Sequence, residues 1–160
     1  MFPKQELIDA PVYFYDDDVD SYQDSKWYPS GSEWLKVTPW GLRSVVNWVK
    51  SHYNDIPVYI TENGVSDRLG NTDDLQRIYV YKHYINQLLK AVLLDKVNIK
   101  GYYAWSLLDN FEWARGYMEK FGLHSVNMTD PDRSRKAKQS SLFYARIAQQ
   151  NGFLENQGPC

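Results

Sequence analysis

The stretch that decides the fold of this chain is Pro57-Val58-Tyr59-Ile60-Thr61-Glu62-Asn63-Gly64. The residues over 58–61 are β-branched or aromatic, which favours a buried strand. A carboxylate, Glu62, follows at once, and the pair Asn63-Gly64 tolerates the backbone angles of a sharp turn. The stretch therefore predicts a strand with a glutamate at its C-terminal end, where α/β proteins place their chemistry.

The local sequence allows Glu62 two interpretations. It can begin an exposed Asn-Gly hairpin turn, or it can be a functional group at a strand end. A hairpin needs a second strand directly after the turn, but residues 65–71 are typical of a loop, and a helical pattern follows them. The sequence that follows therefore disfavours the hairpin and makes Glu62 a candidate functional residue.

Three helical patterns surround this strand along the chain. The first opens with Thr38 as N-cap and Pro39 at the first helical position, and it is expected to end near residue 53. The second covers about 73–94 and the third about 138–150. The residues expected to face inward are Leu42, Val45, Val46 and Val49 in the first helix, Ile78, Tyr81, Ile85, Leu88, Leu89 and Val92 in the second, and Phe143, Tyr144 and Ile147 in the third.

A second buried strand is expected over 101–108, with a long loop after it over about 109–135. Strands separated by helices imply parallel pairing with right-handed crossovers, so the fold class is α/β. Two parallel strands are too few for a sheet covered on both faces, and a complete (β/α)8 barrel needs about 250 residues. We therefore expect a single partial domain over 1–160, whose sheet is completed by a larger unit or a partner. Its parts are a loop-rich lead-in over 1–37, the alternating elements over 38–152 and a tail over 153–160.

The composition argues against several classes of protein. A net charge of −2 gives no overall attraction to nucleic acid or to an anionic membrane. No run approaches the ~20 apolar residues of a membrane-spanning helix. The aromatic content of 16% is unusual, and it is compatible either with an aromatic core or with flat platforms for a sugar ring.

One short pattern bears on localisation. Asn127-Met128-Thr129 matches the acceptor for N-glycosylation, but such triplets often occur by chance and give only slight support for a secretory route. Residues 1–6 lack the basic-then-apolar layout of a signal peptide. The sequence otherwise leaves the localisation open.

Carboxylates and aromatic side chains follow both predicted strands. Glu62 follows the first, while the second carries Trp105 near its end, then Asp109-Asn110-Phe111-Glu112-Trp113, and later Phe121. The C-terminal ends of parallel strands lie on the same side of a sheet, so these groups are expected together. Sugar chemistry uses rings that stack on a pyranose, a carboxylate that binds its hydroxyls and a second one that meets the cationic transition state.

Two motifs in this order resemble glycoside hydrolase family 1, the β-glucosidase family. They are Ile60-Thr61-Glu62-Asn63-Gly64 and Ala104-Trp105-Ser106-Leu107-Leu108-Asp109-Asn110-Phe111-Glu112-Trp113. The resemblance runs from about Trp27 to Phe153 and is closest to the animal lactase-phlorizin hydrolase and lactase-like members. It implies the C-terminal third of a (β/α)8 TIM barrel, from about the sixth to the eighth helix, in an O-glycosyl hydrolase of carbohydrate metabolism.

The resemblance also implies roles for individual residues. Glu62 looks like the catalytic nucleophile, which attacks the anomeric carbon of a β-glycoside and forms a covalent glycosyl-enzyme. Trp105 would form the floor under the glycone ring. Glu112 would accept hydrogen bonds from the O4 and O6 hydroxyls of the sugar, and Trp113 would donate its N–H to another. The remaining implied residues are Phe121, in the pocket wall, and Trp34, at the platform for the aglycone.

Other interpretations of these residues stay open at this point. The aromatic residues can be plain core, and Glu112 can form an ion pair with Arg115. The basic residues Arg133, Arg135, Lys136 and Lys138 are typical of a solvated face. His124 is expected to be packed or exposed, and not catalytic.

The acid/base group of a retaining glycosidase is not in this sequence. Such an enzyme needs a second carboxyl group about 5–5.5 Å from the nucleophile. The family carries it in a Thr-x-Asn-Glu-Pro segment, and this chain contains no Asn-Glu-Pro. The resemblance thus implies a β-glycoside as substrate, no metal or cofactor, and dependence on the missing N-terminal part of the barrel. The alternative is a non-catalytic, Klotho-like module that binds a glycan or a protein.

Overall fold

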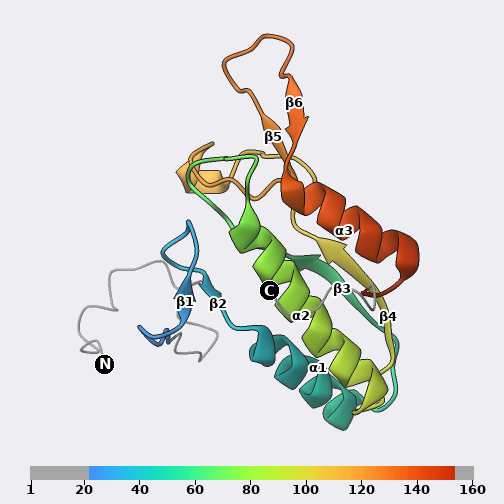
Figure 1. Cartoon of the computed structure of the whole chain (residues 1–160). Helices are drawn as coiled ribbons and strands as arrows, with labels where there is room; N and C mark the ends of the chain where they lie inside the picture. Colours follow the sequence, from blue (N-terminus) through green and yellow to red (C-terminus); the bar gives the residue numbers. More distant parts are fainter. Residues whose placement is uncertain (1–21, 154–160) are drawn as a thin grey trace, which may run out of the picture.

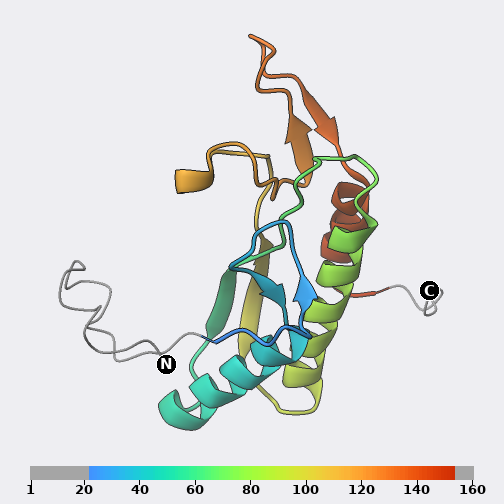
Figure 2. The same ribbon diagram turned by 90° about the vertical axis from the view of Figure 1, so that its left-hand side faces the viewer.

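The computed structural model describes residues 22–153, so most of the expected lead-in and tail lies outside the described residues. Its centre is a parallel pair of strands, β3 (Val58–Asn63) and β4 (Ile99–Ala104). On one face of this pair lie the helices α1 (Pro39–Tyr53), α2 (Leu75–Leu93) and α3 (Gln139–Gln150) (Figures 1 and 2). The predicted parallel pairing is confirmed, and so are the three helices.

Two small antiparallel pairs and one helical turn accompany this unit. β1 (Tyr28–Pro29) pairs with β2 (Lys36–Val37), and β5 (His124–Val126) pairs with β6 (Arg135–Ala137). The β5–β6 hairpin projects from the rest of the chain in both views (Figures 1 and 2). The short helix η3 (Trp113–Arg115) comes between β4 and β5 along the chain. None of the helices within residues 22–153 has the length and apolar character needed to span a bilayer.

The second strand ends earlier than its sequence indicated. The register of the pair is Val58↔Ile99, Ile60↔Tyr102 and Asn63↔Ala104. The pairing stops after Trp105, because the Ser106 N–H donates to the carbonyl of Phe121 at 3.1 Å and not to a neighbouring strand. The prediction of a strand up to residue 108 is therefore wrong, since a contact distant in sequence ends it.

The apolar core lies between the strand pair and the helices. One cluster contains Val46, Leu88, Ala91 and Val97, packed against Val58, Ile60 and Tyr102, and another contains Tyr81, Ile85 and Leu123, packed against Phe143, Tyr144 and Ile147. These contacts confirm the predicted inward positions in α3 and those of Tyr81, Ile85, Leu88 and Leu89 in α2. Val92 is 36% exposed, so the prediction is wrong for that residue. Val45 is also exposed, at 57%, so the apolar stripe of α1 is narrower than predicted.

The opposite face of the strand pair is open in the described part of the chain. Tyr59 and Tyr103 alternate with the packed residues, and they remain 56% and 57% exposed. The strand over 58–61 is thus covered on one face only, and the prediction that it is buried is wrong for Tyr59. Parallel strands are normally covered on both faces, so this pair has the character of an incomplete interior.

A set of polar contacts fixes α1 against the chain that follows α2. Arg43 donates to both oxygens of Asp95 at 2.7 and 2.8 Å, and Asn47 donates to the same carboxylate at 2.7 Å. The hydrogen bonds from Arg43 and then Asn47 hold the pKa of Asp95 well below its usual range. The connection between α2 and β4 is therefore anchored before the second strand begins.

The strand ends approach each other at a glycine. A Cβ added to Gly64 would lie 1.8 Å from the carbonyl oxygen of Trp105, a distance that no side chain can accept. We predict that Gly64→Ala lowers the free energy of unfolding by at least about 2 kcal/mol, because backbone on both sides must move. Gly152→Ala is the matched control, since nothing lies within 4 Å of its added Cβ. Chemical denaturation of the natural full-length protein would measure both, and equal stabilities would contradict the assigned contact.

Candidate active site

Backbone and tyrosine contacts hold the ends of β3 and β4 together. The Trp105 N–H donates to the Asn63 carbonyl at 2.8 Å, which extends the pairing beyond the last residue of β4. The Tyr102 hydroxyl donates to Asn63 Oδ1 at 2.8 Å, and the Tyr81 hydroxyl donates to the Trp105 carbonyl at 3.2 Å. Glu62 and Trp105 therefore lie at strand ends that hydrogen bonds hold in place.

The loop over 106–123 turns back onto this edge. Ser106 and Leu123 close its base, because the Leu123 N–H donates to the Ser106 carbonyl at 2.8 Å. Near its far end the Glu112 N–H donates to the Gly116 carbonyl at 2.7 Å, and η3 begins one residue later. This folding brings Glu112 and Trp113 back toward the ends of the strands.

A cavity of about 350 Å³ lies where these segments meet. Its lining residues are Trp34, Leu35, Glu62, Asn63, Gly64, Trp105, Glu112, Trp113 and Phe121. The structure thus brings together all six site residues predicted from the sequence. Leu35, Asn63 and Gly64 were missed: the last two were interpreted only as turn residues, and Leu35 carries no polar or aromatic signal.

The aromatic residues of the cavity differ in their exposure. Phe121 is 4% exposed and forms a packed wall, whereas Trp105 is 36% exposed and offers part of its ring to the cavity. Trp34 and Trp113 are 59% and 84% exposed. The interpretation as plain core is therefore wrong for Trp113, and it fits Phe121.

Glu112 carries the least satisfied polar group of the cavity. Its Oε1 atom is buried and has no hydrogen-bond partner in the described part of the chain. Burial raises the pKa of Glu112, and the charges of Glu119 and Glu62 raise it further, while a hydrogen bond from Trp105 opposes them. A buried acceptor without a donor is costly, so this oxygen is suited to accept a hydrogen bond from a ligand hydroxyl.

The expected alternative partner of Glu112 is engaged elsewhere. Arg115 Nε lies 3.6 Å from Glu119 Oε1, so the alternative in which Glu112 forms an ion pair with Arg115 is wrong. Glu119 is 5% exposed and also accepts a hydrogen bond from the Ser32 hydroxyl at 2.6 Å. The two glutamates of this loop therefore have different surroundings: Glu119 has partners at both carboxylate oxygens, whereas Glu112 Oε1 has none among the described residues.

Two further predictions concern groups outside the cavity. His124 is half-buried, with its Nδ1 atom 3.1 Å from the Leu107 carbonyl, and it does not line the cavity. Arg133, Arg135 and Lys136 are exposed as predicted, but Lys138 is 1% exposed, so its assignment to a solvated face is wrong. The hydrophobicity pattern could not reveal this, because the partners of Lys138 lie far away in the sequence.

Comparison with known proteins defines the family. The family model for glycosyl hydrolase family 1 matches residues 5–153, and the chain belongs to this family. It is 50% identical to rat lactase/phlorizin hydrolase, in a match that covers 95% of this chain and 8% of the relative. It is 42% identical to guinea pig cytosolic β-glucosidase, in a match that covers 89% of this chain and 30% of the relative.

A similar solved structure agrees with this assignment. The family 1 β-glucosidase from Thermotoga maritima, in complex with isofagomine lactam, matches with a TM-score of 0.75 and 35% identity. The match covers 84% of this chain and 31% of that structure. The chain thus spans less than a third of the length of the relatives named here, and it corresponds to part of their fold.

The surroundings of Glu112 predict an unusual effect on stability. Because its folded-state pKa lies above the ordinary 4.5, the ionised carboxylate destabilises the fold as the pH rises above that value. We predict that Glu112→Gln raises the unfolding midpoint at pH 7, and that this gain shrinks as the pH falls through 4.5. Thermal unfolding across this pH range would measure it. Glu119→Gln is the matched control, since losing a paired carboxylate should lower the midpoint at pH 7; a loss from both variants would contradict the assignment.

Proposed function

We propose that this chain supplies the nucleophile and one side of the sugar site of a retaining β-glycosidase. The observation that carries the proposal is the cavity that joins Glu62 and Glu112 to the rings of Trp105, Trp113 and Phe121. Carboxylates beside aromatic faces match the polar rim and the apolar faces of a pyranose. The relatives named above are a lactase/phlorizin hydrolase and β-glucosidases, which supports this substrate class.

The proposed reaction begins at Glu62. Its carboxylate attacks the anomeric carbon, a carbon–oxygen bond forms, and the bond to the aglycone oxygen breaks. An acid/base carboxyl group protonates the departing oxygen and then takes a proton from water, which attacks the same carbon and releases Glu62. Glu112 and Trp113 bind the sugar hydroxyls, Trp105 and Phe121 bound the ring, and Trp34 faces the aglycone.

The acid/base group in this proposal comes from outside the 160 residues. The open face of the β3–β4 pair and the partial coverage of relatives support placing the chain in the C-terminal third of a (β/α)8 barrel. In this arrangement α1, α2 and α3 are the sixth, seventh and eighth helices, and β3 and β4 are the seventh and eighth strands. The remaining strands cover Tyr59 and Tyr103 and bring the second carboxyl group toward Glu62.

The binding-module alternative is not favoured. A module without catalysis has no need for a carboxylate at the position of Glu62, or for a cavity that joins it to Glu112. The discriminating feature is the acid/base segment of the natural protein. An intact Asn-Glu-Pro there supports the enzyme, and its replacement supports the binder.

Covalent labelling tests the role of Glu62. A 2-deoxy-2-fluoroglycoside slows the second step more than the first, so the glycosyl-enzyme should accumulate on Glu62 in the natural full-length protein. Peptide mass spectrometry locates the label. Glu62→Gln should abolish labelling and lower kcat by about a thousandfold or more. Glu33→Gln is the control, because this exposed carboxylate lies outside the cavity; a label on any other residue would overturn the assignment.

The isolated 160-residue chain should have no glycosidase activity. They lack an acid/base carboxyl group in the family position, and one face of their strand pair is uncovered. We predict no turnover of an aryl β-glucoside, together with strong binding of a dye that senses exposed apolar surface. Measurable hydrolysis by the purified chain would contradict this prediction, because it would require an acid/base carboxyl group within the 160 residues.

A further inference from the structure

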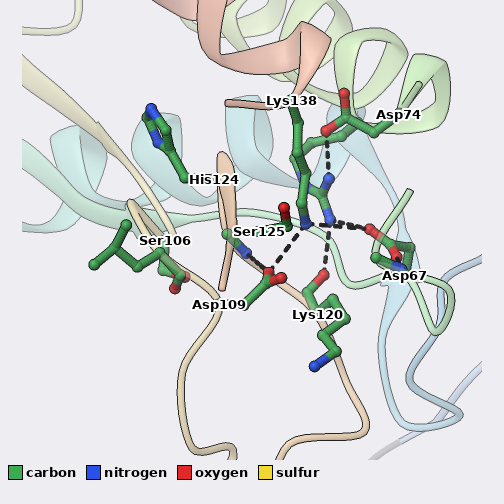
Figure 3. A network of polar contacts seen from close by, with 12 residues as sticks. Asp67, Asp74, Ser106, Asp109, Lys120, His124, Ser125 and Lys138 are labelled. Atoms are coloured by element: carbon green, nitrogen blue, oxygen red, sulfur yellow. Dashed lines mark hydrogen bonds and ion pairs between the residues drawn. The ribbon is translucent and has the colours of Figure 1, made fainter. Parts of the chain in front are cut away.

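Two buried cations within residues 22–153 contact the loops that follow β3 and β4. Lys138 and Arg77 are each 1% exposed, and neither lines the cavity. Figure 3 shows Lys138 extending from the start of α3 toward Asp109 and Asp67, with Lys120 nearby. These partners come from the loops that follow β3 and β4, so the cations join segments that are distant in the sequence.

The contact between Lys138 and Asp109 closes the base of the 106–123 loop. Lys138 Nζ donates to Asp109 Oδ1 at 3.0 Å, and the Gly122 N–H donates to the same oxygen at 2.8 Å. Asp109 lies three residues before Glu112, and Gly122 directly follows Phe121. One carboxylate oxygen thus connects both ends of the segment that carries the sugar-binding residues.

The backbone at this point leaves no room for adjustment. A Cβ on Gly122 would lie 2.2 Å from the Asp109 nitrogen and 2.5 Å from the His124 carbonyl. The Lys138 N–H also donates to the Leu123 carbonyl at 2.9 Å. The side chain and the backbone of Lys138 therefore hold the same short stretch.

Asp67 links this contact to the loop after β3. Lys138 Nζ lies 3.7 Å from Asp67 Oδ2, and Arg77 donates to the same oxygen. Arg77 also donates to the Lys120 carbonyl at 2.7 Å, and the backbones of Asp67 and Lys120 exchange hydrogen bonds at 2.7 and 2.9 Å. The loops after the two strands are thereby joined through buried charges.

We propose that Lys138 is a positioning residue that holds the 106–123 loop in the geometry that aims Glu112 and Phe121 at the sugar. The proposal rests on the proposed function for the identity of the ligand, but the clamp itself rests on the contacts above. Without the ammonium group, Asp109 and Asp67 lose a buried cation, and their repulsion favours separation of the two loops. The consequence is a local opening of the loop base and not the loss of a catalytic group.

Hydrogen–deuterium exchange of the natural full-length protein tests the clamp without requiring activity. Lys138→Met is compared with Lys136→Met, which removes an exposed ammonium group on the same segment. We expect amides over 106–123 to exchange at least tenfold faster in Lys138→Met, while α1 and α2 stay unchanged. Asp109→Asn, a milder variant that keeps the side-chain shape, should give a smaller effect in the same segment. Equal acceleration across the whole protein, or none, would overturn the proposal, as would an unsubstituted protein whose loop is already unprotected.

Kinetics supply the second measurement. Glu112 and Phe121 would contact the sugar in both the ground state and the transition state, so Lys138→Met should raise KM for an aryl β-glucoside about tenfold and change kcat less than threefold. Lys136→Met should leave both constants unchanged. A fall in kcat alone would overturn the positioning role. A protein that shows the local exchange effect but never hydrolyses β-glycosides would refute the proposed function and leave the clamp supported.

Discussion

The parallel pairing of β3 with β4 is the constraint on which the rest of the structure depends. It places two strand ends side by side, and it requires Gly64 because the Trp105 carbonyl occupies the space of a side chain. Parallel strands need a crossover, which α2 provides, and the helices therefore gather on one face. Both loops then leave from the same edge, so Glu62 and Glu112 meet without being close in the sequence.

Buried charged residues provide hydrogen-bond partners for the two loops that leave the paired strands. The two loops that leave this edge form no ladder with a neighbouring strand, so their backbone groups need other partners. Arg77 and Lys138 supply donors that reach carbonyl and carboxylate oxygens of both loops. Burial by itself lowers the pKa of Arg77, but the hydrogen bonds that Arg77 donates to Asp67 and Asp74 raise it overall, so the guanidinium stays charged. An unpaired buried charge costs about 3–5 kcal/mol, which disfavours arrangements of the loops that separate Arg77 or Lys138 from these partners.

The sequence predicted those features that local periodicity controls. The helix α3 and the packing of Tyr81, Ile85 and Leu88 follow from the 3.6-residue period, and the strand over 58–61 follows from its β-branched residues. The early end of β4, the burial of Lys138 and the pairing of Arg115 with Glu119 did not follow, because each depends on a partner brought close only by the fold. The site residues themselves were found through two long motifs, since no periodicity marks a loop.

The buried charged residues of the chain fall into two groups: those whose partners are within the fold, and one with an oxygen available to a ligand. Arg77, Lys138 and Glu119 are buried and paired, so their charges are satisfied by the fold alone. Glu112 is the contrast: within residues 22–153 its buried Oε1 atom has no donor, although Arg115 lies only three residues further along the chain. A buried carboxylate oxygen left without a donor lowers stability, and such a cost is typical of functional sites. Glu112, Trp105 and Trp113 line one cavity. A sugar hydroxyl bound there can donate to the unpaired oxygen of Glu112 and so offset the loss of stability.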